Sequence, residues 1–262
     1  MLYLLRSMRM NWRSAAQYRA SFIMQNLAQL VMGAGELMAV LVLMDRFHGV
    51  GRWSAAEIMF FWGVMQLTFA VVECFARGIS TFAYYVGSGD FDTMLLRPRG
   101  LLLQAACHRL DPRRLGLMLV GAAAMLMAGA QLHIRWTLEK ALLLASAMTG
   151  TFFLLTGLFL IEATVSFFSI KSIEMVNVLT YGGRTACEYP MDVYPRPLRL
   201  LFTWVAPFAL CMHLPVSYML GKPLMDVPMA LVWLAPLTGV AFFLLMARVW
   251  YLGAKHYRST GT

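Results

Sequence analysis

The chain has 262 residues, of which 60% are apolar and only 13% are charged, and its 22 Lys and Arg outnumber its 13 Asp and Glu. An average soluble domain has about 25% charged residues, so this chain lacks the polar side chains that a water-facing surface of its size needs. The composition therefore excludes a soluble globular protein, a disordered chain and a disulfide scaffold, and it leaves a membrane protein with several spans.

Four long segments contain no Asp, Glu, Lys or Arg, and two further apolar stretches are interrupted by only a few charges. About 20 helical residues cross a hydrocarbon core of about 30 Å. Because an unpaired backbone amide finds no water in the bilayer, and these runs lack the alternation of barrel strands, we expect an all-α integral membrane protein. The six expected transmembrane helices, all within one transmembrane domain over 1–262, are 21–44, 55–84, 114–134, 138–165, 198–220 and 228–252.

The first 20 residues have the pattern of an amphipathic helix and lack the apolar core and cleavage site of a signal peptide. Arg6, Arg9 and Arg13 share one helical face, and Trp12 lies on another. We expect an interfacial helix over 1–20, with its arginines toward lipid phosphates. The alternative is a positively charged flank of the first span.

Three acidic residues fall within or beside the expected spans. Glu36 interrupts the first span without a basic residue in the same turn, whereas Glu73 precedes Arg77 by four residues and is expected to pair with it. Glu36 is either a polar group in a substrate pathway or an acid that a neighbouring helix satisfies, and the second interpretation is favoured because buried acids in helical bundles usually find a partner. Glu73 and Glu162 are interpreted as boundary residues.

The first of two distinctive connections lies between the second and third spans. Glycines lead into a short helix that Asp90 is expected to cap and that Pro98 ends. Phe91, Met94 and Leu95 are predicted to share one face, which suits insertion into a groove of a partner domain. The alternative is a surface helix that returns the chain to the membrane. The segment comprises Asp90, Phe91, Asp92, Met94, Leu95, Leu96, Arg97 and Pro98.

The second distinctive connection precedes the fifth span and is rich in glycine and proline. It contains Tyr181, Gly182, Gly183, Arg184, Tyr189, Pro190, Tyr194 and Pro195. Within the last two spans, Pro207, Pro215 and Pro236 each remove a backbone donor. Because proline also clashes with the preceding turn, we expect a kink or break at these positions, and a broken fifth span at Pro207 and Pro215.

Seventeen of the 22 Lys and Arg lie on the side of the expected spans that holds both termini and the two distinctive connections. Cytoplasmic loops are enriched in Lys and Arg, so both termini are predicted to be cytoplasmic. The basic residues follow the membrane edges and form no separate basic patch. We therefore expect the lipid bilayer as a partner and no nucleic acid.

Residues that carry catalytic or metal chemistry are scattered along the chain. The four cysteines and five histidines have no ligand spacing, so neither a metal site nor nucleophilic catalysis is expected. The sequence has no phosphate-binding loop either, because Gly221 and Lys222 are followed by Pro223 instead of Ser or Thr. We expect no enzyme activity and no cofactor bound by this chain; if ATP drives it, another chain binds the nucleotide.

The two distinctive connections resemble those of permease subunits of type-2 ATP-binding-cassette exporters, specifically the small six-span permeases that pair with a separately encoded ATPase. The pattern Gly-x-x-Asp-x-x-Leu-Leu-Arg-Pro of that family is met from Gly89 to Pro98, and the pattern around the fifth span is met from Tyr181 to Pro215. The resemblance implies that the helix near Asp90 to Arg97 is a cytoplasmic coupling helix on which the ATPase docks. It also implies two copies of that ATPase, which carry ATP and Mg, and a second permease chain, identical or paralogous.

The expected function is therefore the membrane-spanning subunit of an ATP-driven exporter, a multi-pass protein of the bacterial plasma (inner) membrane. An amphiphilic or lipid-like substrate suits walls this apolar better than a sugar or an ion does. The alternative is an ion-coupled secondary transporter or channel that uses Glu36, although the paired interrupted spans of an inverted repeat are absent from the sequence. A membrane anchor for a signalling partner leaves the broken fifth span unexplained.

Overall fold

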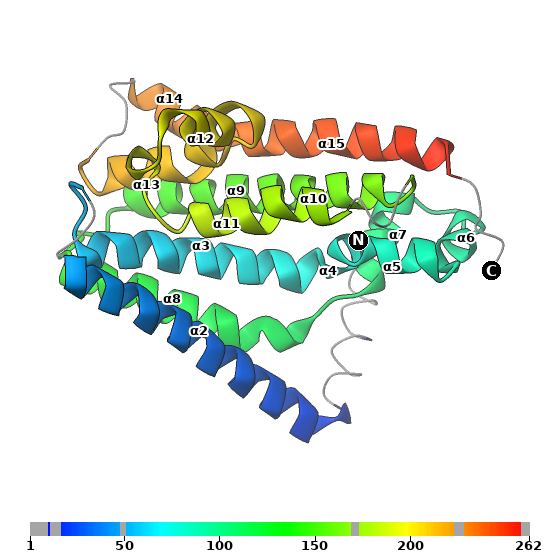
Figure 1. Ribbon diagram of the computed structural model, residues 1–262, viewed down its shortest axis with the longest axis horizontal. Coiled ribbons are helices and arrows are strands. Elements are labelled where there is room, and N and C mark those ends of the chain that lie inside the picture. The colour runs from blue at the N-terminus through cyan, green and yellow to red at the C-terminus, as the bar shows by residue number, and fades with distance from the viewer. Residues whose placement is uncertain (1–9, 11–16, 48–50, 169–172, 223–227, 258–262) are drawn as a thin grey trace.

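The computed structural model describes residues 10, 17–47, 51–168, 173–222 and 228–257. Over these residues the chain is a bundle of helices without a strand (Figure 1). Five helices are long and apolar enough to cross a membrane, or six spans result if one bent helix pair is counted as a span. The predicted all-α membrane class is thus confirmed. The interfacial helix expected over 1–20 falls almost wholly outside the described residues.

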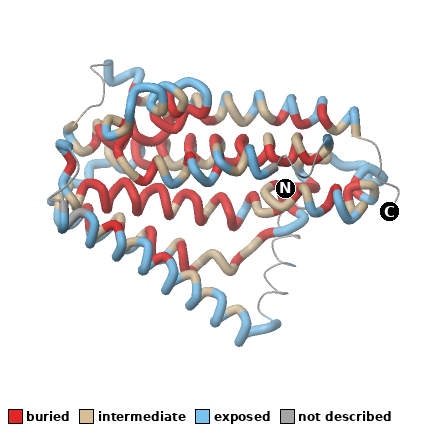
Figure 2. The backbone as a smooth tube through the Cα atoms, in the orientation of Figure 1, coloured by how far each residue is buried: buried red, intermediate tan, exposed pale blue. Residues whose placement is uncertain are grey.

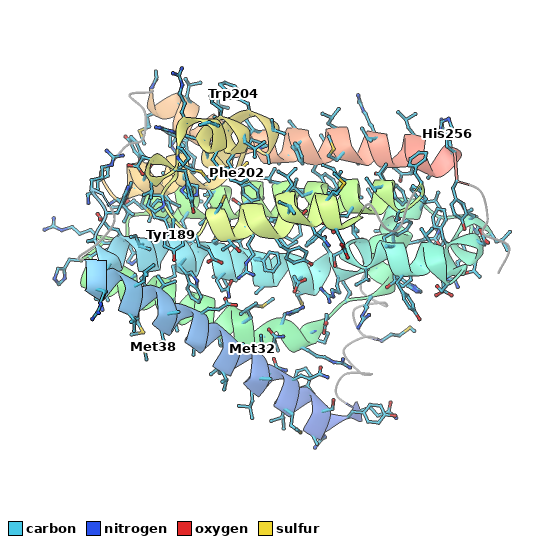
Figure 3. All side chains as sticks on the ribbon, in the orientation of Figure 1. Met32, Met38, Tyr189, Phe202, Trp204 and His256 are labelled. Carbon is cyan, nitrogen blue, oxygen red and sulfur yellow. The ribbon has the colours of Figure 1, made fainter. Side chains whose placement is uncertain are left out.

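The long helices differ greatly in how much of their surface the bundle covers. They are α2 (Arg19–Phe47), α3 (Ala55–Phe75), α8 (Leu115–Gln131), α9 (Leu138–Val165) and the pair α14 (Met229–Leu234) and α15 (Leu237–Lys255). Most of α3 is buried, whereas α2 is exposed along nearly its whole length, as Figure 2 shows. Met32 and Met38 lie on this exposed helix (Figure 3). The core therefore forms around α3 and α9, and α2 offers a large face to lipid or to another chain.

Local sequence signals set the starts of two spans. The Ser54 and Glu57 side chains form a capping box at α3, in which the Ser54 backbone N–H donates to Glu57 Oε2 over 2.8 Å. Before α8, Asp111 Oδ1 accepts from the Arg113 backbone N–H at 3.2 Å and opens a 3₁₀ turn that begins at Pro112. Both caps satisfy backbone donors that the first helical turn leaves without partners.

Glycines allow pairs of spans to approach until their backbones touch. A Cβ atom on Gly63 of α3 would lie 2.6 Å from the backbone nitrogen of Met125 in α8. A Cβ atom on Gly239 of α15 would lie 2.0 Å from the carbonyl oxygen of Gly150 in α9. Because lipid tails are as apolar as the helices, such close packing is a main source of attraction between spans.

The second span is shorter than predicted, because its helix ends at Phe75 and does not continue to residue 84. Four short helices follow: α4 (Arg77–Ser80), α5 (Phe82–Gly87), α6 (Asp90–Leu95) and α7 (Leu101–His108). Gly78 packs directly against α7, because a Cβ atom at Gly78 would lie 2.0 Å from the Ala105 carbonyl oxygen. The last turns of α15 pack here too, and the Phe91 and Tyr257 ring centroids are 5.0 Å apart. We call this end of the bundle the α6 end.

The segment that follows α9 contradicts the predicted cytoplasmic connection. It forms α10 (Ile173–Asn177), the π-helix η2 (Val178–Gly182) and α11 (Gly183–Ala186), which run back through the bundle beside α9 (Figure 1). After α11 the chain reaches Asp192, whose carboxylate accepts a hydrogen bond from Trp53 Nε1 at the start of α3. The motif residues from Tyr181 to Arg184 therefore lie among the spans. The segment gives no hydropathy signal of a span, because it is short and contains Glu174 and Arg184, and charged residues are expected in loops.

The expected fifth span, 198–220, is a bent pair of helices. The first arm consists of α12 (Arg196–Leu200) and the π-helix η4 (Leu201–Val205), and the second consists of the π-helix η5 (Ala209–His213) and α13 (Leu214–Met219). The two arms meet at 86°, so the break predicted at Pro207 is confirmed. The first arm begins just after Asp192, and the second is followed by Lys222, which bonds Glu57 at 2.7 Å in the first turn of α3. The first arm thus begins, and the second arm ends, at the same end of the bundle, which we call the α13 end. The two arms together form a re-entrant hairpin. The predicted crossing of the membrane here was wrong, and Arg196 and Arg199 lie at the α13 end.

Pro215 does not break its helix, contrary to expectation. It lies in the first turn of α13, and the chain continues from the π-helix η5 into α13 without a bend. A proline lacks its N–H and collides with the carbonyl of the residue four positions earlier. The wider π-helical turn before Pro215 relieves that collision, because its carbonyls bond to residues five positions ahead.

Candidate functional site

The short helix α6 begins differently from the predicted arrangement. Its cap is Gly89, whose φ of 75° is a left-handed conformation that glycine adopts without strain, and Asp90 is the first helical residue. The Ser88 hydroxyl donates to Asp90 Oδ2 at 2.9 Å. Asp90 and Asp92 occupy the first turn, where carboxylates interact favourably with the positive end of the helix dipole.

The apolar side chains of α6 and of the next residue, Leu96, divide between the core and the surface. Phe91 and Met94 are buried within this chain, whereas Leu95 is 44% exposed and Leu96 is 86% exposed. The prediction that Phe91 and Met94 face a partner was therefore wrong. The exposed surface of this segment comprises Thr93 and the continuous run Leu95, Leu96, Arg97 and Pro98.

Phe91 anchors α6 in an aromatic cluster that joins three parts of the chain. Its ring centroid lies 5.2 Å from Phe82 of α5, 5.3 Å from Phe167 just after α9, and 5.0 Å from Tyr257 just after α15. Phe82 in turn stacks edge-on against Trp250 of α15 at 5.4 Å. Aromatic pairs of this kind bury large areas in defined geometries, so α6 is firmly attached to the ends of α9 and α15.

A second candidate site is a cavity of about 310 Å³ between α2, α3, the start of α8 and the segment from η2 to α11. It is unusual among the spans because most of its lining is polar or charged. We call it the charged cavity; it is lined by Gln29, Met32, Gly33, Glu36, Gln66, Phe69, Glu73, Arg77, Arg114, Leu117, Tyr181 and Arg184.

Glu73 holds two arginines at the part of the charged cavity nearest the α6 end. Its carboxylate oxygens pair with Arg77 Nη1 and Arg114 Nη2, both at 2.5 Å, and the Glu73 side chain is only 3% exposed. The predicted pair with Arg77 is confirmed. Arg114 was missed because it belongs to another helix, and no local spacing identifies such a partner. Arg114 also donates to Gln29 Oε1 at 3.3 Å and so joins the 3₁₀ turn before α8 to α2.

Glu36 finds its partners on neighbouring segments, as the favoured interpretation predicted. Gln66 Nε2 donates to Glu36 Oε2 at 3.0 Å, and Arg184 Nη2 lies 3.5 Å from the same oxygen. Arg184 also donates to Gln66 and pairs with Glu188 at 3.2 Å, while its guanidinium lies 4.5 Å from the Phe69 ring centroid. Arg184 is thus the residue that joins α2, α3 and α11.

The remaining residues of the second motif are spread along the bundle. Tyr181 lines the charged cavity and packs edge-on against Phe69, and Gly183 lets the Phe208 ring of the re-entrant hairpin come close. Tyr189, Pro190, Tyr194 and Pro195 follow at the α13 end, around the 3₁₀ turn η3 (Met191–Val193). Burial raises the pKa of Tyr194 to about 12, so its phenol stays protonated. The motif is therefore no single site.

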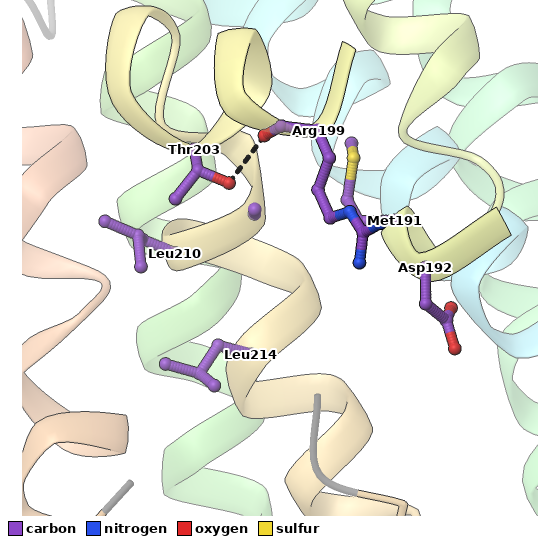
Figure 4. Close-up of a pocket in the computed structure, with 7 residues that line it drawn as sticks. Met191, Asp192, Arg199, Thr203, Leu210 and Leu214 are labelled. Atoms are coloured by element: carbon purple, nitrogen blue, oxygen red, sulfur yellow. Dashed lines mark hydrogen bonds between the residues drawn. The ribbon is translucent and has the colours of Figure 1, made fainter. Parts of the chain in front are cut away.

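A small cavity of about 60 Å³ lies where η3 meets the re-entrant hairpin (Figure 4). It is lined by Met191, Asp192, Arg199, Thr203, Ala209, Leu210 and Leu214. The Thr203 hydroxyl donates to the Arg199 carbonyl at 2.7 Å. The cavity has room for a few water molecules only, so it is a junction of the fold and no substrate site.

Comparison with known proteins adds one finding to this geometry. The family model described as "ABC-2 family transporter protein" matches residues 30–261, which include every described span from α3 onward and most of α2. No curated protein and no solved structure matches the chain. The family is one of membrane transport components that act with a partner ATPase. The chain therefore belongs to the ABC-2 family of transporter proteins.

Proposed function

We propose that this chain is the membrane-spanning subunit of an ATP-driven exporter and that a separate ATPase docks on α6. Family membership supports ABC transport. The observation that carries the docking proposal is the division of α6: Phe91 and Met94 fix the helix from inside, and Leu95 and Leu96 are left exposed beside Arg97. The buried cores of protein interfaces are apolar and enriched in arginine, so exposed leucines beside an arginine on a rigid support suit docking of a partner.

The aromatic cluster gives α6 a path to the spans. A displacement of α6 acts on Phe91, whose ring touches Phe167 after α9 and Tyr257 after α15. Packed interiors transmit such displacement because they are close to incompressible. We infer that closure of the ATPase moves the ends of α9 and α15 through this contact.

We further propose that two permease chains, identical or paralogous, form the transporter together with two ATPases. The Glu36 side chain is 49% exposed on α2, and a carboxylate that faces hydrocarbon is costly. Coverage by a second chain removes that cost and places the two charged cavities along one shared path. ATP and Mg belong to the ATPase in this scheme, and the permease itself has no catalytic role.

The α6 end is proposed to be cytoplasmic, in the inner membrane of a bacterium. Arg97, Arg99, Arg109 and Arg113 gather there, in keeping with the enrichment of cytoplasmic loops in basic residues. Arg196 and Arg199 lie at the α13 end, which reduces the excess of basic residues at the α6 end without reversing it. An amphiphilic or lipid-like substrate suits the apolar walls, and no observation favours the alternative of an ion-coupled transporter.

Docking on α6 is tested by co-purification of the ATPase encoded beside the permease. Leu96→Glu and Leu95→Glu are expected to reduce the co-purified ATPase at least tenfold, because each places a charge in an apolar contact. Leu138→Glu, at an exposed leucine of the α13 end, is the matched control and should leave it unchanged. Unaltered co-purification in both α6 variants would exclude docking there. Deletion of the whole segment is unsuitable, because it removes the core residues Phe91 and Met94.

A further inference from the structure

The half of the charged cavity nearest the α6 end has more positive than negative charge. Arg77 and Arg114 share the single carboxylate of Glu73, and that carboxylate uses both oxygens for them. Two guanidinium groups against one carboxylate leave one positive charge without a counter-ion. In the low dielectric of a membrane protein, this half therefore attracts an acidic group, and the planar guanidinium matches phosphate or carboxylate geometry.

The other half of the charged cavity is lined by one carboxylate and one guanidinium. Arg184 lies 3.5 Å from Glu36 and also pairs with Glu188, a buried carboxylate outside the cavity lining, so Glu36 shares its cation with a second acid. Gln66 and Arg184 both contact Glu36 at Oε2, and about half of the Glu36 side chain is exposed. This half therefore attracts a cationic group such as an amine, which Glu36 is placed to accept.

The two poles are arranged along the bundle axis. Glu73 and Gln66, the α3 residues that mark them, are seven residues apart, which corresponds to about 10 Å of helix. Long arginine and glutamate side chains extend into the space between them. A volume of about 310 Å³ is at the small end of ligand pockets and suits a polar headgroup rather than a whole lipid.

An apolar groove of about 390 Å³ lies between α2 and α8, beside the charged cavity. It is lined by Leu30, Ala34, Leu37, Met38, Leu41, Leu119, Val120, Ala123, Ala124 and Met127. The two hollows are neighbours: Gly33 lines the charged cavity, and a Cβ atom there would lie 3.4 Å from Val120, which lines the groove. A chain attached to a headgroup in the cavity therefore has an adjoining apolar surface to cover.

We propose that the charged cavity and this groove bind a zwitterionic amphiphile, with its acidic group against Arg77 and Arg114, its amine against Glu36, and its apolar chain between α2 and α8. This inference deepens the proposed function, since the bound amphiphile is taken as the substrate class of the exporter. The paired poles distinguish it from an anionic lipid, which leaves Glu36 without a partner charge, and from a neutral lipid, which uses neither pole.

The test measures binding to the purified full-length permease in detergent, without any ATPase. The probes are acyl-labelled fluorescent phosphatidylethanolamine, which carries phosphate and amine, and the equally labelled phosphatidylglycerol, which lacks the amine. The zwitterionic probe is expected to bind about tenfold more tightly, because a charge-assisted hydrogen bond to Glu36 is gained. Glu36→Gln should abolish this preference and leave phosphatidylglycerol binding unchanged. Arg114→Gln should weaken both probes at least tenfold.

Matched controls come from the α13 end, where Glu139→Gln and Arg135→Gln alter exposed residues and should change neither affinity. Ala34→Phe fills the groove and should weaken both probes without changing their ratio. Water-soluble glycerophosphoethanolamine should compete poorly, because it lacks the apolar chain. Equal affinity of the unaltered protein for both probes, equal loss of both in Glu36→Gln, or strong competition by the soluble headgroup would each overturn the proposal. Because the assay contains no ATPase, its result is independent of docking on α6.

Discussion

Arg184 of α11 lies 3.5 Å from Glu36 of α2, although the two residues come from opposite halves of the chain. The contact exists because α10, η2 and α11 return through the bundle, where a hydropathy pattern alone predicts a loop. It gives Glu36 a counter-charge inside the membrane, and it places Arg184 against Gln66, Phe69 and Glu188 at the same time. The packing of three segments therefore depends on one guanidinium.

Removal of Arg184 should cost more stability than removal of Glu36. Arg184→Gln leaves Glu36 and the buried Glu188 without a cation, at a cost of about 3 kcal/mol. Glu36→Gln leaves Arg184 paired with Glu188, and because Glu36 is half exposed it should cost about 1 kcal/mol or less. Denaturant unfolding in detergent, followed by tryptophan fluorescence, measures both. A double variant no worse than Arg184→Gln alone would show that the effects share one network; full additivity would contradict it.

Glu73 is expected to be among the most sensitive charged positions. Glu73→Gln leaves Arg77 and Arg114 facing each other in a buried site, with an expected loss of about 3 to 5 kcal/mol. Glu139→Gln makes the same chemical change in an exposed first turn of α9 and should cost less than about 0.5 kcal/mol. The midpoint of thermal unfolding in detergent distinguishes them. Equal midpoints for the two variants would show that the ion pairs of Glu73 with Arg77 and Arg114 contribute nothing to stability.

The two kinds of apolar residue in α6 should respond in opposite ways. Phe91→Ala opens a cavity in the aromatic cluster and should cost about 3 to 5 kcal/mol. Leu96→Ala should change stability by less than about 0.5 kcal/mol, while it lowers the amount of co-purified ATPase. Unfolding and co-purification are measured on the same preparations. A destabilised Leu96→Ala, or a stable Phe91→Ala, would contradict the division of α6 into core and surface.

Glycine substitutions provide a test of the helix packing. Gly239→Ala should destabilise the protein, because its Cβ would lie 2.0 Å from the Gly150 carbonyl oxygen and must push α15 away from α9. Gly35→Ala is the matched control, since nothing lies within 4 Å of its Cβ and alanine favours a helix by about 1 kcal/mol. The thermal midpoint should fall for the first and stay or rise for the second. An unchanged thermal midpoint in Gly239→Ala would contradict direct contact between the two backbones.

Several features of the site could be predicted from the sequence because they depend on residues within one or two turns. The capping box of Ser54 and Glu57 and the pair of Glu73 with Arg77 both follow from local spacing. The break at Pro207 follows from the missing N–H of proline. The burial of Phe91 and Met94 could not be predicted, because an amphipathic pattern identifies an apolar face and does not tell whether this chain or a partner covers it.

The sequence by itself determined that this protein is an all-helical membrane protein, because the ratio of apolar to charged residues is a property of the whole chain and needs no coordinates. Only the tertiary structure decided that the segment from α10 to α11 lies inside the bundle and that the following helices form a re-entrant hairpin. A polar segment is stable among membrane spans when distant residues supply its counter-charges. For Arg184 those residues include Glu36 and Gln66, which no local pattern connects to it.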